Sequence, residues 1–156
     1  MTVYFLDTSA LVKRYVSEMG SNWVVAQCQP KAGNTIVISQ AALVEAVAAF
    51  CRKTREQSIE QRISEAERDR NIALFKRDVR RQYTTVRVTS TVYDRAGNLC
   101  RIHRLRAYDA IQLASALLIR SKLAVIGVPT LTFVSADVEL LSIGSDEGLS
   151  VENPIS

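Results

Sequence analysis

Four apolar stretches of this chain each contain one charged residue, and in every case that residue is a carboxylate. The four are Asp7 within residues 1–12, Glu45 within 35–50, Asp109 within 107–119 and Asp137 within 123–138. A lone charge is costly to bury unless it is paired, and none of these stretches contains a lysine or arginine. We therefore expect the acids to meet one another around a cation. A site made of carboxylates, without histidine or cysteine, favours Mg²⁺ or Mn²⁺ over zinc.

Short apolar runs alternate with helical patterns along the chain, which predicts an α/β fold with a central, mostly parallel sheet. Continuous apolar runs such as 3–6 (VYFL) and 35–39 (TIVIS) are typical of strands buried on both faces. The other predicted strands are 85–89, 130–134 and 149–152. The first predicted helix is capped by Thr8 or Ser9 and runs through residue 16. The other predicted helices are 21–29, 40–52, 91–103, 108–122 and 137–143. No repeat or linker interrupts the pattern, so residues 1–156 are expected to form a single domain.

Residues 52–83 have a different character, because they hold ten of the twenty lysine and arginine residues together with six acids. Their apolar positions recur at helical spacing. This segment therefore predicts an extended pair of long amphipathic helices whose charged outer face is solvated.

The predicted elements bring the four acids to one edge of the sheet. In open parallel sheets, ligands bind at the carboxyl ends of the strands. Asp7 and Asp137 follow predicted strands, whereas Glu45 and Asp109 lie in the first turns of predicted helices. Asp137 is also placed to act simply as a helix cap. All four side chains can face one cleft.

A cluster of this kind has a defined chemistry. Two like charges about 4 Å apart repel by roughly 4 kcal/mol at an effective dielectric constant of about 20, so the acids require a cation. Mg²⁺ held by a few carboxylates keeps several waters, which suits metal-assisted hydrolysis of a phosphodiester. Ser9 and Ser135 lie two residues from Asp7 and Asp137, and we expect them to hydrogen-bond the carboxylates. The net charge of +4 favours an anionic partner.

Composition excludes several other classes. No apolar run reaches the roughly 18 residues of a membrane span, and no basic leader precedes the first apolar segment. Cys28, Cys51 and Cys100 have no metal-ligand spacing and are expected to be small core residues in a reducing, cytoplasmic compartment rather than a disulfide framework. His103 is the only histidine, and we expect it at a surface or helix end rather than as a general base.

The ordered set of motifs resembles a known family. The segments YFLDTSALVKRY, SQAALVEAVAAF, RAYDAIQLASAL, FVSAD and EGLSVENP together resemble a PIN domain, specifically a VapC-like toxin of bacterial type II toxin–antitoxin systems. The resemblance implies a three-layer α/β/α sandwich, Mg²⁺- or Mn²⁺-dependent endoribonuclease activity, a homodimer and inhibition by a cognate antitoxin. Asp7, Glu45, Asp109 and Asp137 occupy the family's acidic positions, and Ser135 occupies its small hydroxyl position. The 52–83 segment departs from the commonest short members.

Two alternatives belong to other functional classes. A phospho-receiver domain also gathers acids at a sheet edge, but it needs a pair of acids after its first strand and a lysine after a late strand. Asp7 has no acidic neighbour, and the segment from Ser135 to Asp137 contains no lysine. A PIN-like scaffold that binds partners without catalysis is the other alternative. If the protein is a ribonuclease, the basic residues expected to contact RNA are those flanking the cleft, namely Lys13, Arg14, Arg104 and Arg106.

Overall fold

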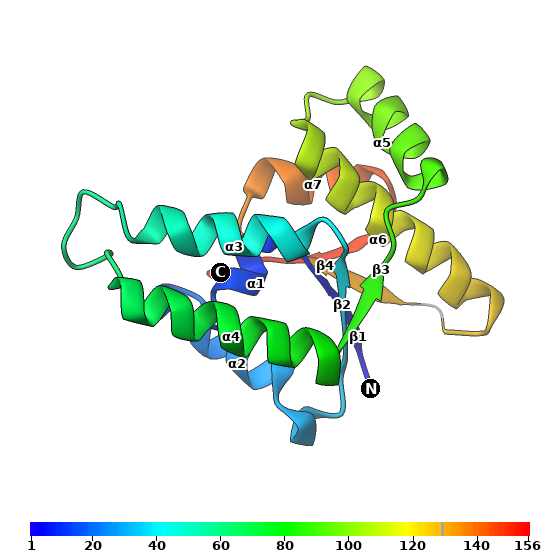
Figure 1. The fold of residues 1–156 in the computed structure, drawn as a ribbon. Helices are drawn as coiled ribbons and strands as arrows, with labels where there is room; N and C mark the ends of the chain where they lie inside the picture. Colours follow the sequence, from blue (N-terminus) through cyan, green and yellow to red (C-terminus); the bar gives the residue numbers. More distant parts are fainter. Residues whose placement is uncertain (129) are drawn as a thin grey trace.

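The structure, a computed structural model, describes residues 1–128 and 130–156. Five strands form one sheet in the order β3-β2-β1-β4-β5, and every neighbouring pair runs parallel (Figure 1). The strands are β1 (Val3–Leu6), β2 (Thr35–Ser39), β3 (Tyr83–Val86), β4 (Leu131–Val134) and β5 (Ser150–Glu152). The predicted parallel α/β fold is confirmed.

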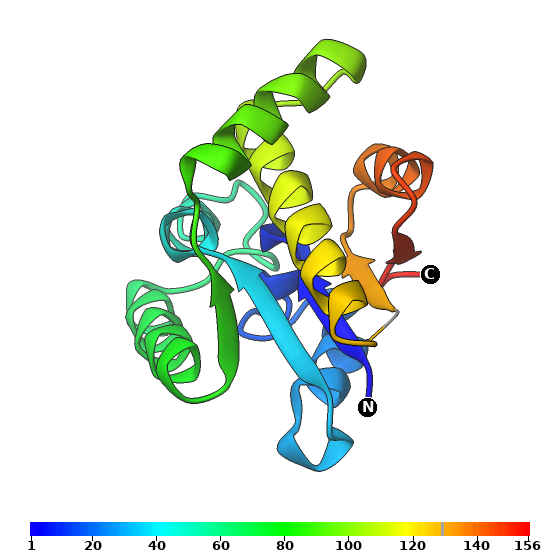
Figure 2. The ribbon, with the colours of Figure 1, turned by 90° about the vertical axis from the view of Figure 1, so that its right-hand side faces the viewer.

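Helices cover both faces of the sheet and make a three-layer sandwich (Figure 2). They are α1 (Thr8–Val12), α2 (Ser21–Cys28), the 3₁₀ turn η1 (Pro30–Ala32), α3 (Ala42–Lys53), α4 (Glu65–Arg81), α5 (Ser90–Ile102), α6 (Ala107–Val125) and α7 (Val138–Asp146). Helices α5, α6 and α7 pack on one face, and α1 to α4 pack on the other. Within the described residues, no helix is both long and apolar enough to cross a membrane.

The central strands are apolar on both sides because each face meets a helical layer. Phe5 and Phe133 are fully buried beneath α6, and their stacked rings lie 5.8 Å apart between centroids. Their neighbours Leu6 and Val134 point to the opposite face, toward α1 and α3. Residue-by-residue alternation between two cores explains why these strands read as unbroken apolar runs in the sequence.

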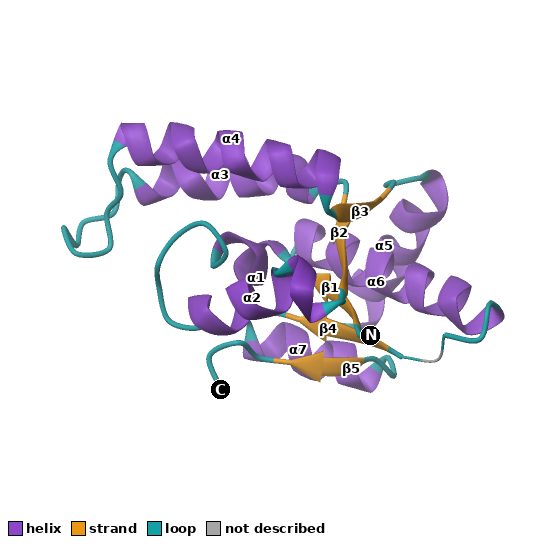
Figure 3. Ribbon diagram, turned by 90° about the horizontal axis from the view of Figure 1, so that it is seen from below, coloured by secondary structure: helices purple, strands orange, loops and turns teal. Residues whose placement is uncertain are grey.

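The prediction of two long helices within residues 52–83 is wrong in detail. Only α4 lies within this segment, and its partner in the extended helical pair is α3 (Figure 3). Residues 54–64 form turns and irregular loop instead, because no apolar surface of the protein covers Ile59, which is 82% exposed. Helix α4 then starts at a capping box, in which Ser64 Oγ accepts the Glu67 N–H at 3.1 Å and Glu67 accepts the Ser64 N–H at 2.7 Å.

Two predicted boundaries also need correction. Strand β3 begins at Tyr83 rather than residue 85 and ends at Val86, because Val86 pairs with Ser39, the last residue of β2. Beyond Val86 the chain has no strand opposite it. Helix α1 ends at Val12 rather than residue 16, and the next residues continue as turns with bonds to carbonyls three residues back.

A buried charged group fixes α4 to the sandwich. Asp78 is 1% exposed, and its Oδ2 lies 3.2 Å from an Arg14 nitrogen and accepts the Tyr15 hydroxyl at 2.9 Å. Arg77 donates two hydrogen bonds to the other carboxylate oxygen at 2.8 and 2.9 Å. Tyr15 also packs edge-on against Phe50 of α3. These contacts hold α3 and α4 in one position relative to α1, which bears on the site because α3 carries Glu45.

Candidate metal centre

Asp7 is the most enclosed acid of the site. It caps α1 directly after β1, so Asp7 rather than Thr8 or Ser9 starts this helix. Its Oδ1 accepts the Ala10 N–H at 2.9 Å and the Ser9 hydroxyl at 2.7 Å, while its Oδ2 accepts the Ser135 hydroxyl at 2.6 Å. The side chain is therefore held by three donors at 4% exposure. Both serines singled out in the sequence bind this one carboxylate.

The serines also join the ends of β1 and β4. Ser9 Oγ accepts the Ala136 N–H at 2.9 Å, and Ser135 Oγ accepts the Asp137 N–H at 3.0 Å. The parallel pairing of β1 with β4 brings these segments together, although they are far apart in the chain. The backbone before α7 is thus tied to the Asp7 side chain.

Glu45 lies in the first turn of α3 and is held by a glutamine from another helix. Gln112 of α6 donates from Nε2 to Glu45 Oε1 at 2.8 Å and to Thr8 Oγ1 at 3.1 Å. Gln112 is only 1% exposed, and its buried Oε1 has no hydrogen-bond partner among the described residues. One amide therefore connects the acid on α3 with α1 and α6.

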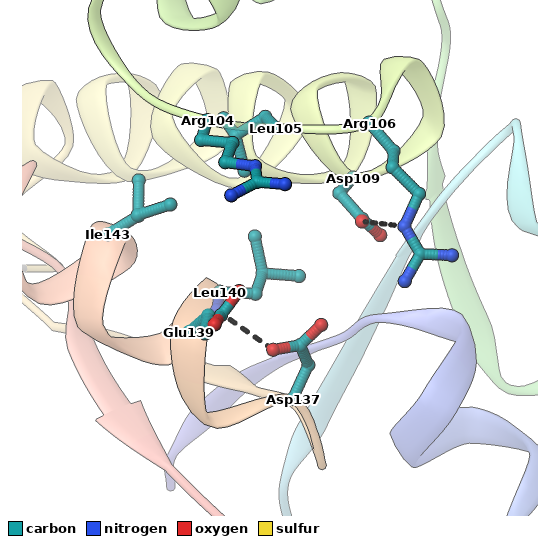
Figure 4. A pocket seen from close by; sticks show the side chains of 8 residues that line it. All are labelled: Arg104, Leu105, Arg106, Asp109, Asp137, Glu139, Leu140 and Ile143. Atoms are coloured by element: carbon teal, nitrogen blue, oxygen red, sulfur yellow. Dashed lines mark hydrogen bonds and ion pairs between the residues drawn. The ribbon is translucent and has the colours of Figure 1, made fainter.

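Asp109 and Asp137 come from different elements and face one another. Asp109 lies in the first turn of α6, with its Oδ2 3.8 Å from Arg106 Nε. Asp137 caps α7 by accepting the Leu140 N–H at 3.1 Å. Figure 4 shows the two carboxylates on opposite walls of a hollow of about 430 Å³ that Arg104 also borders. Asp137 therefore caps α7 and lines the pocket at the same time.

All four acids line one pocket of about 400 Å³ at the carboxyl edge of the sheet. They come from the end of β1, the starts of α3 and α6, and the segment after β4. The structure brings them to a common hollow but not into contact. Within residues 1–128 and 130–156, no three acidic, histidine or cysteine side chains are close enough together to hold a metal ion.

Burial disfavours the charged form of three of these acids. It raises the pKa of Asp7 from its usual 3.8 to about 6, against the hydrogen bonds from Ser135, Ser9 and Ala10, and the charge of Asp109 adds to the rise. Burial also raises the pKa of Glu45, although Gln112 and Thr8 oppose it. For Asp109, burial and the charge of Asp137 raise the pKa while Arg106 lowers it.

The chemistry of this donor set fits a hard divalent cation. The acids supply oxygen ligands only, and histidine and cysteine are absent from the pocket lining. Burial raises the pKa values of Asp7, Glu45 and Asp109, so positive charge placed beside these three carboxylates would favour their ionised form. A divalent ion would supply that charge. Asp7, Glu45, Asp109 and Asp137 are the oxygen donors that the pocket offers to such an ion, and at least three of them would have to move closer together to bind it.

Several functional candidates were not predicted from the sequence. Gln112 holds Glu45 by a hydrogen bond. The sequence signal for this role was that Gln112 is a polar residue one helical turn after Asp109, in a mostly apolar helix. Arg52 and Lys53 line the acidic pocket, although the sequence predicted a solvated surface for the segment that begins with them. Glu18 also lines it, and nothing in the local sequence marked Glu18 as part of a site.

Other predicted basic groups separate into two sets. Lys13 and Arg106 line the acidic pocket, and Arg104 borders the adjoining hollow. Arg14 was expected beside them but points elsewhere, since its guanidinium binds Asp78 and donates to the Tyr83 hydroxyl at 2.8 Å.

His103 ends α5, with Nε2 2.7 Å from a Glu147 oxygen.

The protein is an α/β protein with a parallel sheet, and four acids line a pocket at the carboxyl edge of that sheet. The chain belongs to the PIN domain family, whose sequence pattern matches residues 4–128.

Solved structures share this fold at low sequence identity. VapBC2 from Rickettsia felis, solved bound to a DNA fragment from its promoter, is 16% identical with a TM-score of 0.61, covering 97% of this chain and 98% of that one. PAE2754 from Pyrobaculum aerophilum is also 16% identical with a TM-score of 0.61, covering 98% of this chain and 84% of that one. A search of curated proteins found no match to the sequence.

Proposed function

We propose that this protein is a metal-dependent endoribonuclease, the VapC-type toxin of a toxin–antitoxin pair. The observation that carries the proposal is the convergence of four carboxylates, from four separate segments, on one pocket. Membership of the PIN family supports it, because PIN domains are generally nucleases. Similarity in fold to the Rickettsia VapBC2 structure supports the toxin assignment.

In this proposal, Asp7, Glu45, Asp109 and Asp137 hold Mg²⁺ or Mn²⁺. The bound ion would supply a Lewis acid that polarises the phosphate and activates water for in-line attack. The chain's own residues prepare the site. Ser9 and Ser135 hold Asp7 in one orientation, and Gln112 directs Glu45 toward the pocket.

The proposed partners follow from the same pocket. A cognate antitoxin would block it by inserting an arginine or lysine among the acids, which substitutes for the metal's charge. A homodimer and a cytoplasmic location remain predictions of the VapC resemblance. If the antitoxin binds through the acids, neutralising all four should abolish its binding in a pull-down with the purified partner.

The alternatives differ in testable ways. Receiver domains of the flavodoxin-like type have the strand order 2-1-3-4-5, whereas this sheet has the order β3-β2-β1-β4-β5. A non-catalytic scaffold retains the fold but does not need the acids for its effect.

The test is cleavage of RNA by the purified protein with Mg²⁺ or Mn²⁺, comparing the wild type with Asp109→Asn. This substitution preserves side-chain size and removes the charge, so we expect unchanged circular dichroism and at least a hundredfold loss of cleavage, because loss of a group that only supports a metal ligand already costs about 10–100-fold. Asp94→Asn, at an exposed position of α5, is the matched control and should cleave normally. Equal cleavage by wild type and Asp109→Asn would contradict the proposal.

A further inference from the structure

Two lysines beside the acidic pocket share a single carboxylate. Lys13 Nζ lies 3.0 Å from Glu18 Oε1, and Lys53 Nζ lies 2.9 Å from Glu18 Oε2. The Lys13 side chain is 9% exposed and that of Lys53 is 22% exposed. Lys13 directly follows α1, and Lys53 is the last residue of α3. These three residues, termed here the Lys13–Glu18–Lys53 cluster, thus connect the end of α1, which Asp7 caps, with the end of α3, which carries Glu45.

The Lys13–Glu18–Lys53 cluster carries an excess positive charge. Each ammonium has three N–H donors and gives one of them to Glu18. Burial alone raises the pKa of Glu18, but hydrogen bonds from Lys53 and Lys13 lower it below its usual value, so Glu18 stays ionised. Two cations against one anion leave a net charge of +1 in a largely enclosed place, with donors still available to an anion.

The charge of the whole pocket agrees with an anionic ligand once a metal is present. Five carboxylates line it, the four candidate ligands and Glu18, and they face four basic side chains, Lys13, Arg52, Lys53 and Arg106. The lining therefore has a formal charge of −1 when all are ionised. One divalent cation changes that to +1, which a single phosphodiester neutralises.

The position of the cluster indicates where that phosphate belongs. Lys13, Glu18 and Lys53 line the acidic pocket and also an adjoining hollow of about 430 Å³. Val16, Met19 and Ile155 border this second hollow together with Ser17, Gln61 and the acidic Glu60, and Met19 is 74% exposed. A single strand that leaves the acids in this direction passes the two ammonium groups before it reaches this partly apolar wall.

We infer that Lys13 and Lys53, which are bridged by Glu18, form a binding subsite for an RNA backbone phosphate. This phosphate is the one next to the phosphodiester that is cleaved. This inference rests on the proposed ribonuclease function and names the path of the RNA through the same site. Glu18 sets the spacing of the two ammonium groups and also competes with the phosphate for their donors.

The test measures binding of a fluorescein-labelled single-stranded RNA of mixed sequence to the full chain, with Mg²⁺ and in the Asp109→Asn background, so that a cation is available to the pocket while cleavage does not interfere. The variants are Lys53→Gln and Glu18→Gln. Lys31→Gln is the control, because it removes the same charge from an exposed residue of η1, before β2 and so at the opposite edge of the sheet. Circular dichroism checks that each variant is folded.

The expected result follows from counterion release. Loss of one phosphate contact to a single strand lowers the slope of log K against log salt by about 0.7. Lys53→Gln should therefore bind RNA about eightfold more weakly at 50 mM salt, and less than about twofold more weakly at 500 mM. Lys31→Gln should match Asp109→Asn alone at both.

Glu18→Gln separates a phosphate subsite from a purely structural ion pair. Removing the competing carboxylate should tighten RNA binding, opposite in sign to Lys53→Gln. A structural cluster predicts weaker or unchanged binding in both variants. RNA binding that is weaker or unchanged in both variants would refute the phosphate subsite. Equal RNA binding by Lys53→Gln and Lys31→Gln would also refute it.

Cleavage by the wild type with Mn²⁺ is measured in parallel. Absence of cleavage would count against the ribonuclease function, whereas the binding series decides the subsite independently.

Discussion

Replacing the buried acid Asp7 with asparagine should stabilise the metal-free protein while destroying its proposed activity. Asp7 is 4% exposed, and burial raises its pKa from 3.8 to about 6. At pH 7 the ionised carboxylate therefore costs the folded state about 3 kcal/mol relative to the unfolded chain. The asparagine side chain would be neutral and of the same size.

Part of that gain is offset by hydrogen bonding. The oxygen that accepts from Ala10 and Ser9 survives in asparagine, but an amide N–H₂ replaces the oxygen that accepts the Ser135 hydroxyl at 2.6 Å. Rearranging that bond costs about 1 kcal/mol. The net gain is about 2 kcal/mol, which corresponds to a rise in melting temperature of roughly 4–8 °C for a chain of this size.

The effect should depend on pH with a definite sign. Because the folded-state pKa lies above the unfolded value, the wild type is most stable with Asp7 protonated and loses that stability as pH rises through about 6. The advantage of Asp7→Asn over the wild type should therefore be largest at pH 7, disappear at about pH 4.5 and reverse at lower pH, where only the cost of the rearranged hydrogen bond remains. The raised pKa values of Glu45 and Asp109 act on wild-type stability in the same direction.

The assay is thermal unfolding followed by circular dichroism, in EDTA at pH 7 and near pH 4. Asp94→Asn, exposed on α5, is the control and should melt as the wild type does. An Asp7→Asn variant that is less stable than wild type at pH 7, or whose advantage persists at pH 4, would refute the idea that burial of this charge dominates its energetics.

Three further outcomes are expected. Mn²⁺ at a hundredfold excess over its dissociation constant should stabilise the wild type by about 2.7 kcal/mol in thermal melts, and Asp7→Asn should abolish most of this; no metal effect at concentrations that support cleavage would argue against the centre. Gln112→Leu should weaken Mn²⁺ binding at least tenfold in calorimetry. It should change unfolding free energy by less than about 1 kcal/mol, because the unpartnered Oε1 is removed too. Asp78→Ala should destabilise the fold by about 3–5 kcal/mol in urea, since the largely buried Arg14 loses its carboxylate partner, and a loss under 1 kcal/mol would contradict that role.

The sheet could be predicted because its physical cause is local. Strands covered on both faces need apolar side chains at every position, so 3–6 and 35–39 are recognisable without any knowledge of their neighbours. The α3–α4 hairpin was harder. Whether residues 54–64 continue a helix depends on an apolar surface to cover them, and no local pattern reports its absence.

The acids of the candidate centre were also recognisable from the amino-acid order, because an isolated charge in an apolar stretch is unusual whatever the fold. Their meeting at one pocket followed from strand ends and helix starts in a parallel sheet. The groups that hold and surround them were decided by the tertiary structure. Gln112 reaches Glu45 across 67 residues, and Glu18 reaches Lys53 across 35. Side-chain pairs this far apart depend on how helices cross, and a single sequence does not encode that geometry in any local pattern.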